Sequence, residues 1–155
     1  MSGVATLALI VSTGGAAHAA TGPVRIWNHW TRLCLQPASL EELAAVVQKP
    51  CDGGDLQAWA YQKVTGTRYK FINLADNLCL NEFDPLDFNA RVLMVQCVRV
   101  SNEEWQTHAS LPHEAVPLES RSGNTDTRYC IDANLGEAVL MYGCLFSPSQ
   151  SWAIL

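Results

Sequence analysis

Six cysteines are the residues with the most distinctive chemistry in this chain, and they fall into three pairs. The two members of a pair lie 17, 18 or 14 residues apart: Cys34 with Cys51, Cys79 with Cys97, and Cys130 with Cys144. Cysteines at such spacings either form disulfides or bind metal. The sequence has no Cys-x-x-Cys pair, and its four histidines do not pair with cysteines at ligand spacing. Disulfides within the pairs are therefore favoured over a metal site, and each closed loop of ~15 residues would contribute about 3 kcal/mol.

The acidic residues do not form a pattern that indicates catalysis. Glycoside hydrolysis needs two facing carboxyl groups. Glu41–Glu42 and Glu103–Glu104 are adjacent in sequence, so a strand would direct the members of each pair to opposite faces. The chain has no Gly-x-Ser-x-Gly motif, and Gly53–Gly54 precede no helix, as a phosphate loop would require. We predict no enzyme activity, no cofactor and no bound metal.

The cysteine pairs belong to an internal repeat. A Trp follows the second Cys of each pair by eight residues, and a Gln or Glu lies two residues before that Trp. The tryptophans are Trp59, Trp105 and Trp152, at spacings of 46 and 47 residues. Matched positions in three copies predict three repeats of ~46 residues, over about 22–66, 67–116 and 117–155.

The local pattern predicts short strands. The segments VRIW, YKFI, VLMVQC and AVLMYGC are rich in β-branched or aromatic residues and are bounded by turn formers. Two stretches differ: residues 39–47 carry a capping-box pair and helical spacing, which predicts a helical turn, and residues 107–117 carry two prolines, which predicts a linker. The fold class is therefore all-β.

The repeated Trp is best explained by packing. A unit of about four short strands cannot bury its apolar face alone, whereas three units around an axis can share a core. Trp59, Trp105 and Trp152 are predicted to supply that core with large apolar surfaces. The polar residue two positions earlier can satisfy backbone groups where strands turn.

The first 20 residues indicate export. Val4–Val11 is a short apolar run, and Ala17-His18-Ala19 offers a small-x-small cleavage signal, so residues 1–20 are predicted to be a signal peptide, although no Lys or Arg precedes the run. The run is too short to span a bilayer. A net charge of -5 disfavours nucleic acid as a partner. We expect a secreted protein without a transmembrane segment, which agrees with its even number of cysteines.

The recurring Cys-[Leu/Ile]-x, second Cys and [Gln/Glu]-x-Trp resemble the ricin B-type β-trefoil lectins, the R-type lectin family, over residues 22–155. The resemblance implies a three-lobed β-trefoil of twelve strands, closed at one end by hairpins. It also implies glycan binding, often of galactose type, in a shallow pocket on each lobe. Members of this family usually lack catalytic activity, and they often serve as the targeting module of a toxin or glycoside hydrolase.

Carried over position by position, the resemblance favours a sugar site in the third repeat. There Asp132 lies at the position of the carboxylate that bonds sugar hydroxyls, and Tyr142 at that of the stacking aromatic ring. Gln150 is the motif Gln that would bond a further hydroxyl, and Ser149 precedes it in place of the usual Asn. The third repeat also departs from the family at Leu140, where a polar residue is common, and its shorter loop between cysteines could narrow the pocket.

The other two repeats depart further from the family pattern. The second has Asn81 and Val95 at the carboxylate and stacking positions, and the first has Gln36 and Lys49. Neither is expected to bind a sugar.

The main alternative is a trefoil that binds a protein instead of a sugar, as a subunit of a secreted toxin or hydrolase complex. Trp27 and Trp30 would support it if both were exposed. Alternation along the first strand favours an inward Trp27 and a partly exposed Trp30.

Overall fold

The computed structural model describes residues 19–83, 90–98, 100–121, 128–133 and 136–155. The predicted signal peptide falls almost wholly on residues 1–18, outside the described part of the chain. The described strands are β1 (Thr21–Val24), β2 (Ile26–Asn28), β3 (Leu33–Pro37), β4 (Val46–Pro50), β5 (Trp59–Thr65), β6 (Arg68–Asn73), β7 (Leu78–Glu82), β8 (Val92–Gln96), β9 (Trp105–Gln106), β10 (His113–Val116), β11 (Glu119–Ser120), β12 (Tyr129–Asp132), β13 (Leu140–Gly143) and β14 (Trp152–Ile154). Short 3₁₀ turns η1 (Asp55–Gln57), η2 (Ser101–Glu103) and η4 (Pro148–Gln150) precede β5, β9 and β14. The all-β prediction is confirmed.

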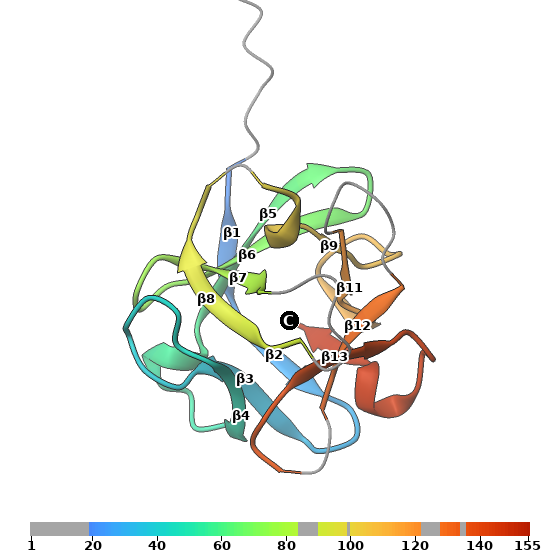
Figure 1. Ribbon diagram of the computed structural model, residues 1–155, viewed down its shortest axis with the longest axis horizontal. Helices are drawn as coiled ribbons and strands as arrows, with labels where there is room; N and C mark the ends of the chain where they lie inside the picture. The colour runs from blue at the N-terminus through green and yellow to red at the C-terminus, as the bar shows by residue number, and fades with distance from the viewer. Residues whose placement is uncertain (1–18, 84–89, 99, 122–127, 134–135) are drawn as a thin grey trace, which may run out of the picture.

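Each repeat contributes one hairpin to one end of the molecule: β3–β4, β7–β8 and β12–β13. The three hairpins lie around a common centre (Figure 1). Isolated backbone bridges join each hairpin region to the other two, as a closed ring: Ala45 with Leu93, Arg91 with Leu140, and Val47 with Ala138. These bridges close one end of the fold.

The remaining strands pair mostly between repeats and form the barrel. β5 pairs with β6 and β9 with β11, which join the first repeat to the second and the second to the third, and β14 pairs with β2, which joins the last repeat to the first. Backbone hydrogen bonds between Arg25 and Leu155 tie the C-terminal residue to the start of β2. The arrangement of barrel and three hairpins is a β-trefoil, as the resemblance to the ricin B-type lectins implies.

The three repeated tryptophans are fully buried at the starts of β5, β9 and β14. Each indole Nε1–H donates to the carbonyl of the residue that follows the first Cys of its repeat: Trp59 to Leu35 at 2.9 Å, Trp105 to Leu80 at 3.0 Å, and Trp152 to Ile131 at 3.0 Å. The predicted core role of the tryptophans is confirmed. Their polar edges also fasten each hairpin to the barrel.

The three predicted disulfides are present as Cys34–Cys51, Cys79–Cys97 and Cys130–Cys144, one in each repeat. Each joins the first strand of a hairpin to the segment that follows its second strand. The disulfides therefore hold together the hairpin ends that face the barrel.

Two local predictions are wrong. Residues 39–47 contain no helix; they run from the turn between β3 and β4 into β4, with Leu40 and Leu43 exposed. Because Pro37 pairs with Val46, the chain between them must turn back on itself. The residues with helical spacing therefore cannot form a helix. The predicted linker contains β10, which pairs with β14 because the edge of that strand is available to it.

The expected inward direction of Trp27 is also wrong. Its neighbours Ile26 and Asn28 are fully buried, so the alternation along β2 turns Trp27 outward. Trp27 is partly covered by its neighbours, with the guanidinium carbon of Arg32 5.4 Å from its ring centre. Trp30 is 63% exposed.

Candidate functional site

Asp132 and Tyr142 lie on neighbouring strands of the third hairpin and on the same face. Cys130 pairs with Tyr142 across β12 and β13, and Asp132 pairs with Leu140. Opposed residues and alternate residues share a face, so Asp132 and Tyr142 are diagonal neighbours, with Cα atoms about 7–8 Å apart by ordinary sheet geometry. Ile131 lies between them in register and is fully buried on the other face.

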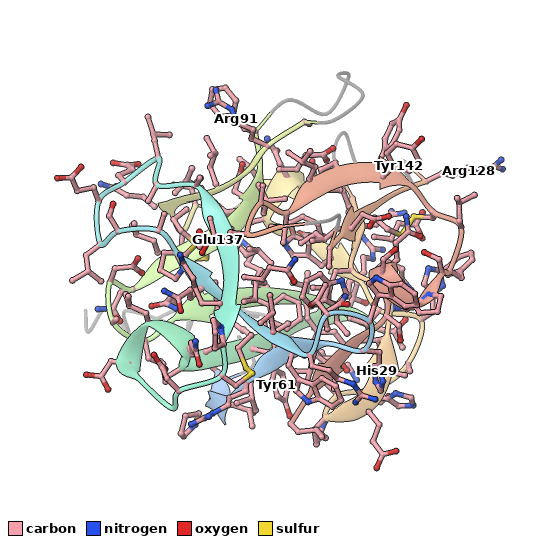
Figure 2. All side chains as sticks on the ribbon, turned by 90° about the horizontal axis from the view of Figure 1, so that it is seen from below. His29, Tyr61, Arg91, Arg128, Glu137 and Tyr142 are labelled. Atoms are coloured by element: carbon pink, nitrogen blue, oxygen red, sulfur yellow. A yellow bond between two sulfur atoms is a disulfide. The ribbon has the colours of Figure 1, made fainter. Side chains whose placement is uncertain are left out.

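The outer face of this hairpin carries an exposed aromatic ring beside a partly buried carboxylate. Tyr142 is 41% exposed and extends outward from β13 (Figure 2). Asp132 is half-buried at the end of β12. The structure therefore brings together the two residues that the sequence assigns to stacking and to hydroxyl binding.

Gln150 holds Asp132 in place. Its side-chain Nε2 donates to Asp132 Oδ2 at 3.0 Å and to the carbonyl of Gly143 at 2.8 Å. Its Oε1 accepts the backbone N–H groups of Leu145 at 2.7 Å and Phe146 at 3.0 Å. Two donor hydrogens and two lone pairs exhaust the capacity of the amide, and the residue is only 1% exposed. The expectation that Gln150 itself bonds a sugar hydroxyl is therefore corrected, because its polar atoms are committed to the protein.

Ser149 belongs to the 3₁₀ turn η4 beside this network. Its carbonyl accepts hydrogen bonds from the backbone N–H of Ala133 at 2.9 Å and from Asn28 Nδ2 at 2.8 Å. Its hydroxyl lies 2.9 Å from that of Ser147. Ser149 thus fixes η4 against the residue that follows Asp132, with its side chain half-exposed.

The first repeat keeps this framework without the binding groups. Gln57 Nε2 donates to Gln36 Oε1 at 2.9 Å and to the carbonyl of Pro50 at 2.9 Å, while its Oε1 accepts the N–H of Asp52 at 3.0 Å. Lys49 replaces the aromatic ring and forms an ion pair with Glu137. A neutral amide and a paired cation stand where the third repeat has a carboxylate and a ring.

The second repeat replaces the motif Gln by Glu103, which is fully buried. Glu103 Oε1 accepts the N–H of Val98 at 2.8 Å, as the Gln does elsewhere. Its Oε2 cannot donate, and Lys70 Nζ supplies the missing donor at 2.7 Å while also donating to the carbonyl of Val98 at 2.7 Å. Lys70 is not among the residues predicted from the sequence, because a single Lys inside the predicted strand YKFI does not indicate which residue it pairs with.

The shorter third loop does not alter the relation between Asp132 and Tyr142. Asp132 is opposite Leu140, just as Gln36 is opposite Val47 in the first hairpin. The third loop is therefore shorter only between Asp132 and Leu140, in the turn of the hairpin.

The sequence profile of the ricin-type beta-trefoil lectin domain matches residues 22–152. The chain belongs to this family. No protein with a curated description matches this lectin domain.

Solved structures share its fold at low sequence identity. The designed three-fold symmetric protein ThreeFoil superposes with a TM-score of 0.75 at 18% identity, over 85% of this lectin domain and 96% of that chain. 1,3Gal43A, an exo-β-1,3-galactanase from Clostridium thermocellum, gives 0.76 at 17%, over 87% of this chain and 30% of that one. The cytolethal distending toxin from Actinobacillus actinomycetemcomitans gives 0.66 at 17%, over 85% and 90%. The lectin domain thus spans less than a third of the galactanase chain but most of the toxin chain.

Two further features bear on the kind of site. Among the described residues, no three His, Cys, Asp or Glu side chains are grouped so that they could hold a metal ion. The described part of the lectin domain also contains no helix with the length and apolarity needed to cross a membrane.

Proposed function

We propose that this lectin domain binds galactose-type glycans through its third repeat. The observation that carries the proposal is the placement of Asp132 and Tyr142 as diagonal neighbours on the outer face of one hairpin, with Gln150 bonded to the carboxylate. This combination would present a fixed acceptor and an apolar ring on one face of the hairpin, with Cα atoms about 7–8 Å apart by sheet geometry.

Asp132 would orient the sugar. A carboxylate offers about four lone-pair sites, so the hydrogen bond from Gln150 leaves capacity for two sugar hydroxyls. Because Gln150 holds it, little side-chain entropy is lost when the ligand binds. Ser149, half-exposed on the adjoining turn, would offer a further hydroxyl at the rim.

Tyr142 would supply the apolar contact. In galactose the axial hydroxyl at C4 leaves several C–H groups together on one face of the ring, and an exposed aromatic ring packs well on such a face. Lys49 and Val95 occupy the same register in the other two hairpins and offer no ring, which restricts the proposal to the third repeat.

The domain would act as a non-catalytic, secreted recognition module. Its three disulfides suit an oxidising compartment, and its family is a lectin domain. One shallow site would bind weakly, so tight attachment would need several copies or a tethered partner.

A glycan array with the disulfide-bonded protein tests the proposal. Tyr142→Ala and Asp132→Asn would be run beside it, with Val95→Ala as a control at the matching position of the second repeat. Binding to galactose-type glycans that is lost in the first two variants and kept in the control supports the proposal. Silence of folded wild-type protein, or equal binding by Tyr142→Ala, would overturn it.

A second candidate is a protein-binding subunit of a secreted toxin or hydrolase complex. It is favoured by Trp30, which is 63% exposed, by the outward Trp27, which contacts His29 and Arg32, and by the fold shared with the cytolethal distending toxin. Exposed Trp and Arg are typical anchors of protein interfaces. Co-purification of a secreted partner that Trp30→Ala abolishes, without any array binding, would favour this function over the lectin.

A further inference from the structure

A hollow lies at the opposite end of the third hairpin from Asp132. It measures about 390 Å³ and is lined by His108, Glu119, Arg128, Cys144 and Phe146. Arg128 and Asp132 are four residues apart along the chain, which corresponds to about 13 Å along an extended strand. Asp132 and Tyr142 do not line the hollow, although Arg128 is only two residues from Cys130, the strand partner of Tyr142. The hollow is large enough for a small ligand, since such sites usually measure about 300–1,000 Å³.

Glu119 is a buried carboxylate where the other repeats have apolar residues. It pairs with Cys130 as Trp27 pairs with Cys34 and Ile72 with Cys79, so the three positions correspond. Glu119 is 4% exposed. Burying a carboxylate is unfavourable unless it is paired, so packing alone does not explain an acid at this position.

Two groups of the hollow bond to Glu119. Its Oε2 lies 2.7 Å from His108 Nε2, and its Oε1 accepts the backbone N–H of Arg128 at 3.1 Å. Because a carboxylate accepts, Nε2 of His108 carries the hydrogen, and Nδ1 remains for another partner. The His108 side chain is 47% exposed, so the pair connects a buried acid to solvent.

Phe146 forms the apolar wall of the hollow in an unfavourable conformation. Its φ is +53°, and that of His108 is +59°. The first repeat has Gly53, with φ +80°, at the position of Phe146, and glycine adopts such angles without cost. A bulky side chain there costs of order 1–3 kcal/mol.

The ring of Phe146 is 65% exposed and meets His108 edge to face, with centroids 6.0 Å apart. Leu43 also combines a positive φ with an exposed apolar side chain, so these two features alone do not distinguish Phe146. Phe146 differs because its ring lines a hollow and contacts His108, which is bonded to a buried carboxylate.

We propose that this hollow is a second glycan subsite, specific for a sugar that carries a carboxylate, such as a uronic acid. Phe146 would stack on the C–H face of the ring, and the His108–Glu119 pair would bond its hydroxyls. Arg128 is exposed at the rim and extends outward on the same side of the molecule as Tyr142, where its positive charge can reach the sugar carboxylate (Figure 2).

The combination of an open aromatic plate with polar groups favours a sugar over a peptide. A sugar presents hydroxyls around an apolar ring face, which matches a ring beside a His–Glu pair. The subsite does not depend on the galactose-type site, because Asp132 and Tyr142 do not line the hollow.

The test compares methyl glucuronide with methyl glucoside, which differ in a carboxylate, by saturation-transfer NMR. Phe146→Gly removes the plate and relieves the backbone, so this variant should fold at least as well as wild type. Arg128→Gln removes the charge. Leu145→Ala is the matched control, because Leu145 is 71% exposed next to Phe146 and does not line the hollow.

The wild-type protein and Leu145→Ala should bind the glucuronide more tightly than the glucoside. Phe146→Gly should weaken glucuronide binding about tenfold, and Arg128→Gln should abolish the preference for the glucuronide over the glucoside. Tyr142→Ala should change neither the glucuronide affinity nor this preference. Equal binding of the two sugars, unchanged binding by Phe146→Gly, or loss of binding in Tyr142→Ala would overturn the proposal. Binding of an acidic peptide to the hollow, when the glucuronide does not bind there, would overturn it as well.

Discussion

Replacing Lys70 by Met should strongly destabilise the second repeat. The substitution leaves the Glu103 carboxylate buried with no cation, and it removes the hydrogen bonds from Lys70 Nζ to Glu103 and to the carbonyl of Val98. Removing one partner of a buried ion pair costs about 3–5 kcal/mol, because the remaining charge is uncompensated. Lys70 is itself only 12% exposed, so water offers little compensation.

A loss of 3–5 kcal/mol is a large part of the 5–15 kcal/mol that stabilises a typical domain. In a domain of this size it corresponds to a Tm lower by about 6–20 °C. Urea unfolding with the disulfides intact would measure the loss as a lower midpoint with an unchanged slope.

The double variant Lys70→Met with Glu103→Gln should recover most of this stability. Gln57 and Gln150 occupy the equivalent positions and form their hydrogen bonds without a lysine. A Gln at position 103 can accept from the Val98 N–H and, as Gln57 and Gln150 do, donate to the carbonyl of the residue before the second Cys, which is Gln96 in this repeat. A cost below about 1 kcal/mol for Lys70→Met, or a double variant no more stable than the single one, would refute the reasoning.

Three further perturbations have defined outcomes. Trp152→Phe leaves the Ile131 carbonyl without its donor and should lower the free energy of unfolding in urea by about 1–3 kcal/mol. An unchanged midpoint would show that the indole hydrogen bond does not stabilise the fold. Replacing both Cys130 and Cys144 by Ala should cost about 3 kcal/mol, measured as a lower Tm, and equal thermal stability would contradict this. Burial raises the pKa of the Asp76 carboxyl above its ordinary value of 3.8, although the N–H of Leu78 opposes the shift. The folded state therefore binds this proton more readily than the unfolded state, and stability falls as pH rises from about 3.8 through the raised pKa. Asp76→Asn should remove this fall and leave stability below about pH 3 little changed. If the urea midpoint of Asp76→Asn fell with rising pH as steeply as that of the wild type, the fall would not come from Asp76.

The parts of the fold that recur in the chain could be predicted from the sequence. The Cys pair and the Trp recur at matching positions in three copies, which indicates that they have the same structural role in each repeat. This recurrence predicts the three disulfides and the shared core. Asp132 and Tyr142 were assigned from the resemblance to the lectin family, by their offsets to Cys130 and Cys144, since neither residue recurs in the other repeats.

Features that depend on contacts between distant segments could not be predicted. The helical spacing of residues 39–47 is overridden by the pairing of Pro37 with Val46, and β10 forms because β14 offers an edge. Lys70 meets Glu103 from 33 residues away, so no local pattern reveals the pair. Gln150 shares the position of a binding residue, but its burial and four hydrogen bonds can be seen only in three dimensions.

The most direct test of the lectin function is an amide NMR titration of the disulfide-bonded protein with methyl galactoside, using methyl glucoside, its C4 epimer, as the control sugar. We predict saturable shifts confined to residues around Asp132, Tyr142 and Ser149, larger with the galactoside and absent in Tyr142→Ala. Shifts confined to the first or second repeat, or no shifts at saturating galactoside, would contradict it.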